Sequence, residues 1–180
     1  MLLNGNGVKK DKKEAMKYLK NSADLGNTES MVEYGRNNLL DINGNKKEAA
    51  RYIKMSAEKG NNEGLFVYGI ICRYGLSNLE DGELIYINYA NSAKYLKMAA
   101  DKGHVKAMRA YGEMLLNGTE ISMNLKEASK YLKMAANEGD SEAMVQYAQM
   151  LIDGNGIKMN KIEAAYYFKK SAELNNELGM

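Results

Sequence analysis

Two side chains in this sequence could carry acid–base or nucleophilic chemistry, His104 and Cys72, the chain's one histidine and one cysteine. An imidazole can act as a general base, and a thiolate can attack an electrophile when a neighbouring cation lowers its pKa. His104 lies between Gly103 and Val105 at the expected start of a helix, which favours a capping role. Cys72 follows two isoleucines, which favours a buried, inert thiol, although the adjacent Arg73 could lower its pKa slightly.

The same counts exclude several kinds of site. One cysteine cannot form a disulfide within the chain, and one histidine with one cysteine cannot supply a zinc site of the usual Cys/His kind. The glycine-rich NGNG turns lack the Lys-Ser/Thr of a phosphate-binding loop and recur along the chain, so we interpret them as turns. We therefore expect no catalytic residue, no cofactor and no metal.

The composition predicts a soluble, ordered protein. Of 180 residues, 45% are apolar and 27% charged, and the net charge is +2. Such an even balance provides no basic field for nucleic acid, and the run Lys9–Lys13 is expected to be the solvated start of a helix. No apolar stretch approaches a signal peptide or a membrane span, so we expect a cytoplasmic protein with no direct membrane insertion.

An internal repeat dominates the sequence. Similar strings of the type Tyr-x-Lys-x-[Ser/Ala]-Ala recur at spacings of 34, 43, 36 and 36 residues, beginning at Tyr18, Tyr52, Tyr95, Tyr131 and Tyr167. A second series of tyrosines keeps the same register at Tyr34, Tyr68, Tyr111 and Tyr147, and a third series is Gly26, Gly60, Gly103, Gly139 and then Asn175. Three series in one register predict a repeat protein.

Each unit reads as two helices, illustrated by 107–116 and 124–138, whose small and apolar residues fall on one side of a helical wheel. The second helices carry a capping-box spacing, with Asp or Asn three residues before Glu, at 11/14, 45/48, 124/127 and 160/163. We expect each second helix to end at the third series, where Gly or Asn can adopt the left-handed conformation.

These series divide the chain into a single array: a partial first repeat (1–30), then 31–64, 65–107, 108–143 and 144–180. The repeat at 65–107 carries an insertion at 75–87, which either folds back onto the body or extends the second helix backwards from Asn88. Neither end of the sequence has a polar cap, which leads us to expect a segment of a longer array or, as the alternative, association through the ends.

Taken together, Asn4–Val8, Gly154–Ile157, the Lys-Glu-Ala strings and 103–107 resemble the Sel-one-like repeat, a relative of the tetratricopeptide repeat. The resemblance spans almost the whole chain and departs from the pattern at the insertion, at 118–120 and at 43–45. It implies an all-α protein, a right-handed α/α solenoid superhelix of about five helix-turn-helix repeats.

The resemblance also implies a non-enzymatic scaffold or adaptor that binds a protein or peptide partner. The alternatives are a structural solenoid that associates with itself end to end, and a hydrolase of the cysteine-rich branch of the family. With Cys72 alone, the chain departs from the disulfide-linked pattern of that branch.

We predict that a partner peptide or helix binds the concave face formed by the first helices. The candidate residues lie opposite the core positions of these helices: Val32, Arg36, Phe66, Val67, Ile70, Arg73, Arg109, Glu113, Val145 and Gln149. Phe66, Val67 and Ile70 would form an apolar centre, and the three arginines could receive an acidic peptide. The other interpretation of these apolar residues is that the insertion covers and buries them.

Overall fold

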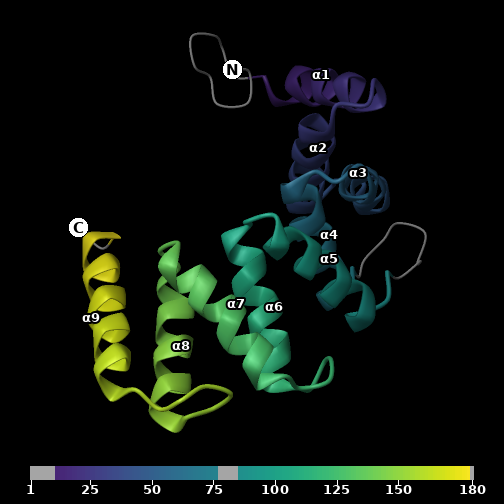
Figure 1. Cartoon of the computed structure of the whole chain (residues 1–180). Coiled ribbons are helices and arrows are strands. Elements are labelled where there is room, and N and C mark those ends of the chain that lie inside the picture. The colour runs from purple at the N-terminus through teal and green to yellow at the C-terminus, as the bar shows by residue number, and fades with distance from the viewer. Residues whose placement is uncertain (1–10, 77–84, 179–180) are drawn as a thin grey trace. The chain divides into compact units, whose positions relative to one another are not determined.

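The computed structural model describes residues 11–76 and 85–178, the last four as backbone only (Figure 1). Across these ranges the chain forms nine α-helices and no strand longer than an isolated bridge. The helices are α1 (Lys12–Asp24), α2 (Thr28–Leu40), α3 (Lys46–Glu58), α4 (Asn62–Tyr74), α5 (Tyr89–Asp101), α6 (Val105–Asn117), α7 (Leu125–Asn137), α8 (Ser141–Asp153) and α9 (Lys161–Leu178). They belong to two compact units, one ending at Asn88 and one starting at Tyr89.

Helices that follow each other in the chain pack side by side within each unit. In the N-terminal unit α1 packs on α2, α2 on α3 and α3 on α4, and α2 also touches α4. In the C-terminal unit the same sequential packing runs from α5 to α9. This arrangement confirms the predicted helix-turn-helix repeats, in which α2, α4, α6 and α8 are first helices and α3, α5, α7 and α9 are second helices.

The predicted N-caps of the second helices are confirmed at all four capping-box positions. The backbone N–H of the Glu donates to the side-chain oxygen of the capping residue at 2.9 Å for Glu14 to Asp11 and at 2.8 Å for Glu48 to Asn45. The corresponding bonds to Asn124 and Asn160 are both 3.1 Å long. Each cap satisfies a backbone donor that the first turn of a helix leaves unpaired.

The predicted helix ends are confirmed at four positions and wrong at the fifth. Gly26, Gly60, Gly103 and Gly139 have φ values of 96°, 81°, 90° and 94°, a conformation that glycine adopts without strain. At the fifth position stands Asn175, and α9 continues through it to Leu178. Asn adopts the left-handed conformation less readily than Gly, and the helix therefore does not stop there.

The insertion at 75–87 folds back onto the body at both of its described ends. Leu76 and Ile85 form an antiparallel bridge with N–O distances of 3.0 and 3.1 Å, and both pack against the buried cluster of Ala50, Ile53 and Ile71. Helix α5 begins at Tyr89, so the alternative of a helix extended backwards from position 88 is wrong. The middle of the insertion, 77–84, lies outside the described residues.

Pairs of tyrosines join the two helices of a repeat. Tyr111 on α6 and Tyr131 on α7 meet edge to face with ring centroids 5.0 Å apart, and 34/52 and 147/167 repeat the contact at 5.1 and 5.2 Å. The Tyr131 hydroxyl also reaches back to the preceding second helix, where it donates to Asp101 Oδ1 at 2.6 Å. Tyr52 donates to Asp24 and Tyr167 to Asn137 in the same way. In three repeats the second-helix tyrosine thus ties its own repeat to the one before.

The Asp101 contact makes stability depend on pH. The hydrogen bond from Tyr131 and the Lys97 ammonium at 2.9 Å outweigh burial and hold the pKa of the Asp101 carboxyl below its ordinary value. A depressed pKa stabilises the fold above the unfolded-state value, and this contribution is lost as the pH falls through the folded-state value. We expect urea midpoints of wild type and Asp101→Asn to differ at neutral pH and to converge below about pH 4. If the two urea midpoints still differed by the same amount at pH 3, the effect of the substitution would come from altered packing and not from the lost charge.

Candidate protein-interaction surface

The residues predicted to bind a partner all lie on first helices, as expected, and fall into two sets. Those of the N-terminal unit lie on α2 and α4, and those of the C-terminal unit on α6 and α8. Each set has its own geometry. Participation of these residues in binding stays a prediction.

In the N-terminal unit, two of the predicted residues are buried. Val32 is 4% exposed and Arg73 is 8% exposed, with the Arg73 guanidinium 5.5 Å from the centre of the Tyr74 ring. Arg36 is exposed and its Nη1 lies 2.6 Å from Glu63 Oε1, so α2 and α4 are joined by an ion pair. The arginines of this unit therefore already have intramolecular contacts.

The predicted apolar centre on α4 is half buried. Phe66, Val67 and Ile70 each retain part of their surface, while Val67 packs against the same core cluster as Leu76 and Ile85 at the two ends of the insertion. Of the three apolar residues, Val67 therefore packs on the same buried cluster as the two described ends of the insertion. The face of α4 still presents apolar surface within little more than one helical turn.

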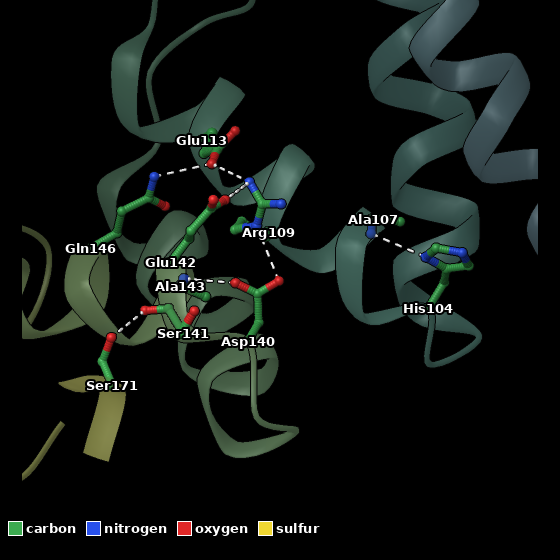
Figure 2. A network of polar contacts seen from close by, with 10 residues as sticks. All are labelled: His104, Ala107, Arg109, Glu113, Asp140, Ser141, Glu142, Ala143, Gln146 and Ser171. Atoms are coloured by element: carbon green, nitrogen blue, oxygen red, sulfur yellow. Dashed lines mark hydrogen bonds and ion pairs between the residues drawn. The ribbon is translucent and has the colours of Figure 1, made fainter. Parts of the chain in front are cut away.

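In the C-terminal unit, Arg109 is the centre of a polar network between α6 and α8 (Figure 2). Its Nε lies 3.1 Å from Asp140 Oδ2, and its Nη1 lies 3.1 Å from Glu113 Oε1 and 2.7 Å from Glu142 Oε2. Burial disfavours the charged guanidinium, but Asp140 and Glu113 outweigh this and raise the pKa of Arg109. The network holds the start of α8 against α6, because Asp140 also caps α8 by accepting from Ala143 N at 2.9 Å.

The burial of this network sets it apart from the exposed Arg36–Glu63 pair between α2 and α4. Arg109→Ala removes a cation that is 25% exposed and leaves the carboxylate of Asp140, 12% exposed, without its partner. We expect a loss of about 1–3 kcal/mol in unfolding free energy. The exposed Arg36 serves as the matched comparison, and Arg36→Ala should cost less than about 1 kcal/mol. Urea denaturation of both variants measures the difference, and equal losses would refute the structural role of Arg109.

An open pocket of about 400 Å³ lies beside the network, lined by Ser141, Glu142, Val145, Gln146 and Ser171. Val145 is 43% exposed. Gln146 donates from Nε2 to Glu113 Oε1 at 3.0 Å, while its buried Oε1 accepts no hydrogen bond from the described residues. Ser171, on α9, is buried and its Oγ donates to the Ser141 carbonyl oxygen at 3.0 Å (Figure 2).

Sequence reasoning selected Val145 in this region and did not select Ser141, Glu142 or Ser171. The signal that could have found them is the repeat register. Ser141, Glu142 and Ser171 correspond to Thr28, Glu29 and Ser56 in the first complete repeat. Their types are shared by these two repeats. Small polar residues at helix starts are ordinary, however, and only the structure shows that these three meet.

The two residues with possible chemistry lie where the sequence placed them. His104 caps α6, with its Nδ1 accepting from Ala107 N at 3.2 Å. Cys72 is buried in α4, and burial raises the pKa of its thiol. Among the described side chains, no group of three or more His, Cys, Asp or Glu residues is placed to hold a metal ion. No helix in the described ranges has the length and apolar character needed to cross a membrane.

The paired helices, their tyrosine contacts and their glycine stops define a helical repeat protein of the solenoid class. The family model described as Sel1 repeat matches five segments: residues 1–27, 28–61, 70–104, 105–140 and 141–176. The chain belongs to the Sel1 repeat family, as the sequence resemblance implied. Members of this family typically serve as scaffolds for protein interaction.

Solved structures show the same fold. A Sel1 repeat protein from Oxalobacter formigenes is 23% identical, with a TM-score of 0.81 over 96% of this chain and 69% of that one. A protective antigen of uropathogenic Escherichia coli strains, c5321, which displays an SLR fold, is 22% identical, with a TM-score of 0.87 over 98% of this chain. The chain spans only 37% of that antigen's length. Helicobacter pylori cysteine rich protein B is 19% identical, with a TM-score of 0.52 over 75% of this chain and 92% of that one. No curated protein matched the sequence.

Proposed function

We propose that this chain is a non-enzymatic interaction module whose first helices bind a peptide or helix of a partner protein. The observation that carries the proposal is the apolar face of α4, where Phe66, Val67 and Ile70 keep part of their surface exposed. Partly exposed apolar residues grouped on one helix face are typical anchors of protein interfaces. The family to which the chain belongs supports the same class of function.

The electrostatics of the first helices favour an apolar partner over an acidic one. Arg36 is paired with Glu63, and Arg109 is surrounded by Glu113, Asp140 and Glu142. An acidic peptide would have to displace these intramolecular carboxylates, which removes much of the gain. A partner that inserts apolar side chains against α4 meets no such cost.

The proposal is tested by affinity capture with the immobilised chain. The double variant Phe66→Glu/Ile70→Glu places two charges on the α4 face, and circular dichroism checks that it stays helical. Leu40→Glu/Ile42→Glu is the matched control, since it adds the same charges at residues that are 86% and 91% exposed in the same unit. We expect a partner that is retained by wild type and control and lost by the α4 variant. Equal capture by all three proteins would refute the assignment of this face.

A further inference from the structure

Asn-Gly pairs recur in this chain, and they can undergo a reaction that the proposed function does not use. The described ranges contain three of them, at 43/44, 117/118 and 155/156. In such a pair the backbone nitrogen of the glycine can attack the side-chain amide of the asparagine, because glycine has no Cβ to hinder the approach. Two further pairs, at 4/5 and 6/7, lie outside the described residues. The surroundings of the glycine nitrogen decide which pair reacts.

The reaction consumes one water molecule and converts an amide into a carboxylate. The glycine nitrogen forms a bond to Cγ of the asparagine and closes a five-membered succinimide ring. The side-chain amide nitrogen leaves as ammonia, taking up the proton that the glycine nitrogen loses. Water then adds to one of the two ring carbonyls and opens the ring to aspartate or isoaspartate, so no oxidant or reductant takes part. A glycine N–H that donates a hydrogen bond must first give up that bond, which slows the attack.

Hydrogen bonds hold the glycine nitrogen in two of the three pairs. Gly44 N donates to the Asp41 carbonyl oxygen at 3.0 Å, and Gly118 N donates to that of Met114 at 3.2 Å. Asn117 is in addition the last residue of α6, so the helix fixes its backbone dihedral angles. Both pairs are therefore protected by the fold.

The pair at 155/156 lacks this protection. Asn155 and Gly156 are exposed, and Gly156 N donates no hydrogen bond to any residue in the described part of the chain. The N–H of Asn155 donates to the Met150 carbonyl oxygen at 3.1 Å, which holds the backbone before the reacting atoms and leaves those atoms unpaired. We propose that Asn155 deamidates spontaneously in the folded protein, and that the product loosens the turn between α8 and α9 from α7. The reaction is independent of the proposed function, because it requires no partner protein.

The place of the pair relative to the helix end explains the difference. Asn155 lies beyond Gly154, the residue that ends α8, whereas Asn117 lies within α6 and directly before its end at Gly118. Counted by the repeat register, Asn155 corresponds to Thr119, so the preceding repeat has no Asn-Gly pair at this place. The last repeat thus carries its asparagine in the turn and not on a helical backbone.

The modified turn affects α7, because Gly156 packs directly on the first residue of that helix. A Cβ on Gly156 would lie 2.4 Å from the carbonyl carbon and oxygen of Leu125 and 2.7 Å from its Cβ. Isoaspartate lengthens the backbone by one methylene immediately before this glycine and adds a carboxylate. So close a contact has no space for an added atom, and the turn therefore moves away from Leu125. Leu125 directly follows Asn124, the capping residue of α7, so the displacement acts on the capped start of the helix.

The test is peptide mapping by mass spectrometry of the full-length chain after storage in a mildly alkaline buffer, in which backbone amides lose their proton more readily. Trypsin cleaves after Lys and Arg and so separates the three pairs into peptides 37–46, 110–126 and 134–158. In the folded chain we expect Asn155 to deamidate at least about threefold faster than Asn43 or Asn117, since one backbone hydrogen bond corresponds to a factor of about 2–10. In concentrated guanidinium chloride, which removes the hydrogen bonds, the three rates should converge.

Two variants connect the modification with its effect on packing. Asn155→Gln removes the site, because the longer side chain would have to close a six-membered ring, and the stored variant should keep the urea midpoint of freshly prepared protein. Asn117→Gln leaves the reactive pair in place and serves as the matched control. Storage should lower its urea midpoint as it does for wild type.

Three results would overturn the inference. The first is a rate at Asn155 equal to or below that at Asn43 or Asn117 in the folded chain. The second is an excess at Asn155 that stays unchanged in guanidinium chloride, since neighbouring residues and not the fold would then set the rate. The third is an equal loss of stability on storage in wild type and Asn155→Gln, since the modified turn would then not be what weakens the packing. None of these results depends on the partner captured through α4, so the two proposals fail separately.

Discussion

Replacing Tyr131 with Ala is expected to lower the free energy of unfolding of the C-terminal unit by about 3–5 kcal/mol. The ring is 1% exposed and meets Tyr111 edge to face. Its hydroxyl donates to Asp101 at 2.6 Å and accepts from Lys97 Nζ at 2.8 Å. Truncation opens a cavity in the repeat and breaks its tie to the preceding repeat. Urea denaturation followed by circular dichroism measures the loss.

Two further variants separate the contributions of ring and hydroxyl. Tyr131→Phe keeps the ring and loses both hydrogen bonds to charged groups, and it should cost about 1–3 kcal/mol. Tyr166→Ala removes a tyrosine that is 58% exposed in the same unit and should cost less than about 1 kcal/mol. If Tyr166→Ala proved as damaging as Tyr131→Ala, the tyrosine contact would not be what joins the repeats.

Replacing Gly112 with Val is expected to lower the free energy of unfolding by about 2–3 kcal/mol. This loss outweighs the small gain in helix propensity that follows from removing a glycine. A Cβ at this position would lie 2.9 Å from Leu132 Cγ and 3.1 Å from Leu132 Cδ2. Helices α6 and α7 therefore approach closely because one residue has no side chain. The valine forces them apart along a contact that is otherwise buried. Thermal and urea unfolding of the variant check the sign and the size.

The fourth complete repeat provides the natural counterpart of this variant. Ala148 holds the position of Gly112 there, is fully buried, and lies in the repeat that has Phe168 where others have Ile53, Leu96 or Leu132. Ala148→Gly should therefore lower the free energy of unfolding by about 1 kcal/mol. If glycine were preferred at this position in every repeat, the same variant would be more stable than wild type. A stabilised Ala148→Gly variant would show that the alanine there is crowded as well.

The sequence predicted helices and their order well because the determinants are local. A capping residue and its Glu lie three positions apart, and a stop at Gly139 depends on that residue's own φ. The predicted end of α9 was wrong because Asn175 fits the sequence pattern of a helix stop but remains within the helix, which continues to Leu178. The insertion could be assigned to one of two arrangements only by seeing Ile85 against the core of α3 and α4.

The candidate surface was less predictable because it depends on which helix covers which. Val32 and Val145 occupy the same position on the helical wheel and differ tenfold in exposure. Arg36 and Arg109 both looked like cations facing solvent, yet each pairs with at least one carboxylate at the start of the next first helix along the chain. Such pairings join residues that are 27 to 33 positions apart, beyond the reach of helix periodicity.

The tyrosine hydroxyls connect neighbouring repeats, so the protein behaves as a one-dimensional lattice in which each repeat interacts with its nearest neighbours. The bonds from Tyr52, Tyr131 and Tyr167 span 28, 30 and 30 residues, so three of the repeats are each fastened to the preceding one by a donor of their own. In such a lattice a lesion raises the local opening rate at one junction and leaves distant junctions at full strength. Growth is equally local, because an added unit brings one donor and presents one new acceptor. A protein built this way can lengthen its surface without altering the packing of the repeats already present.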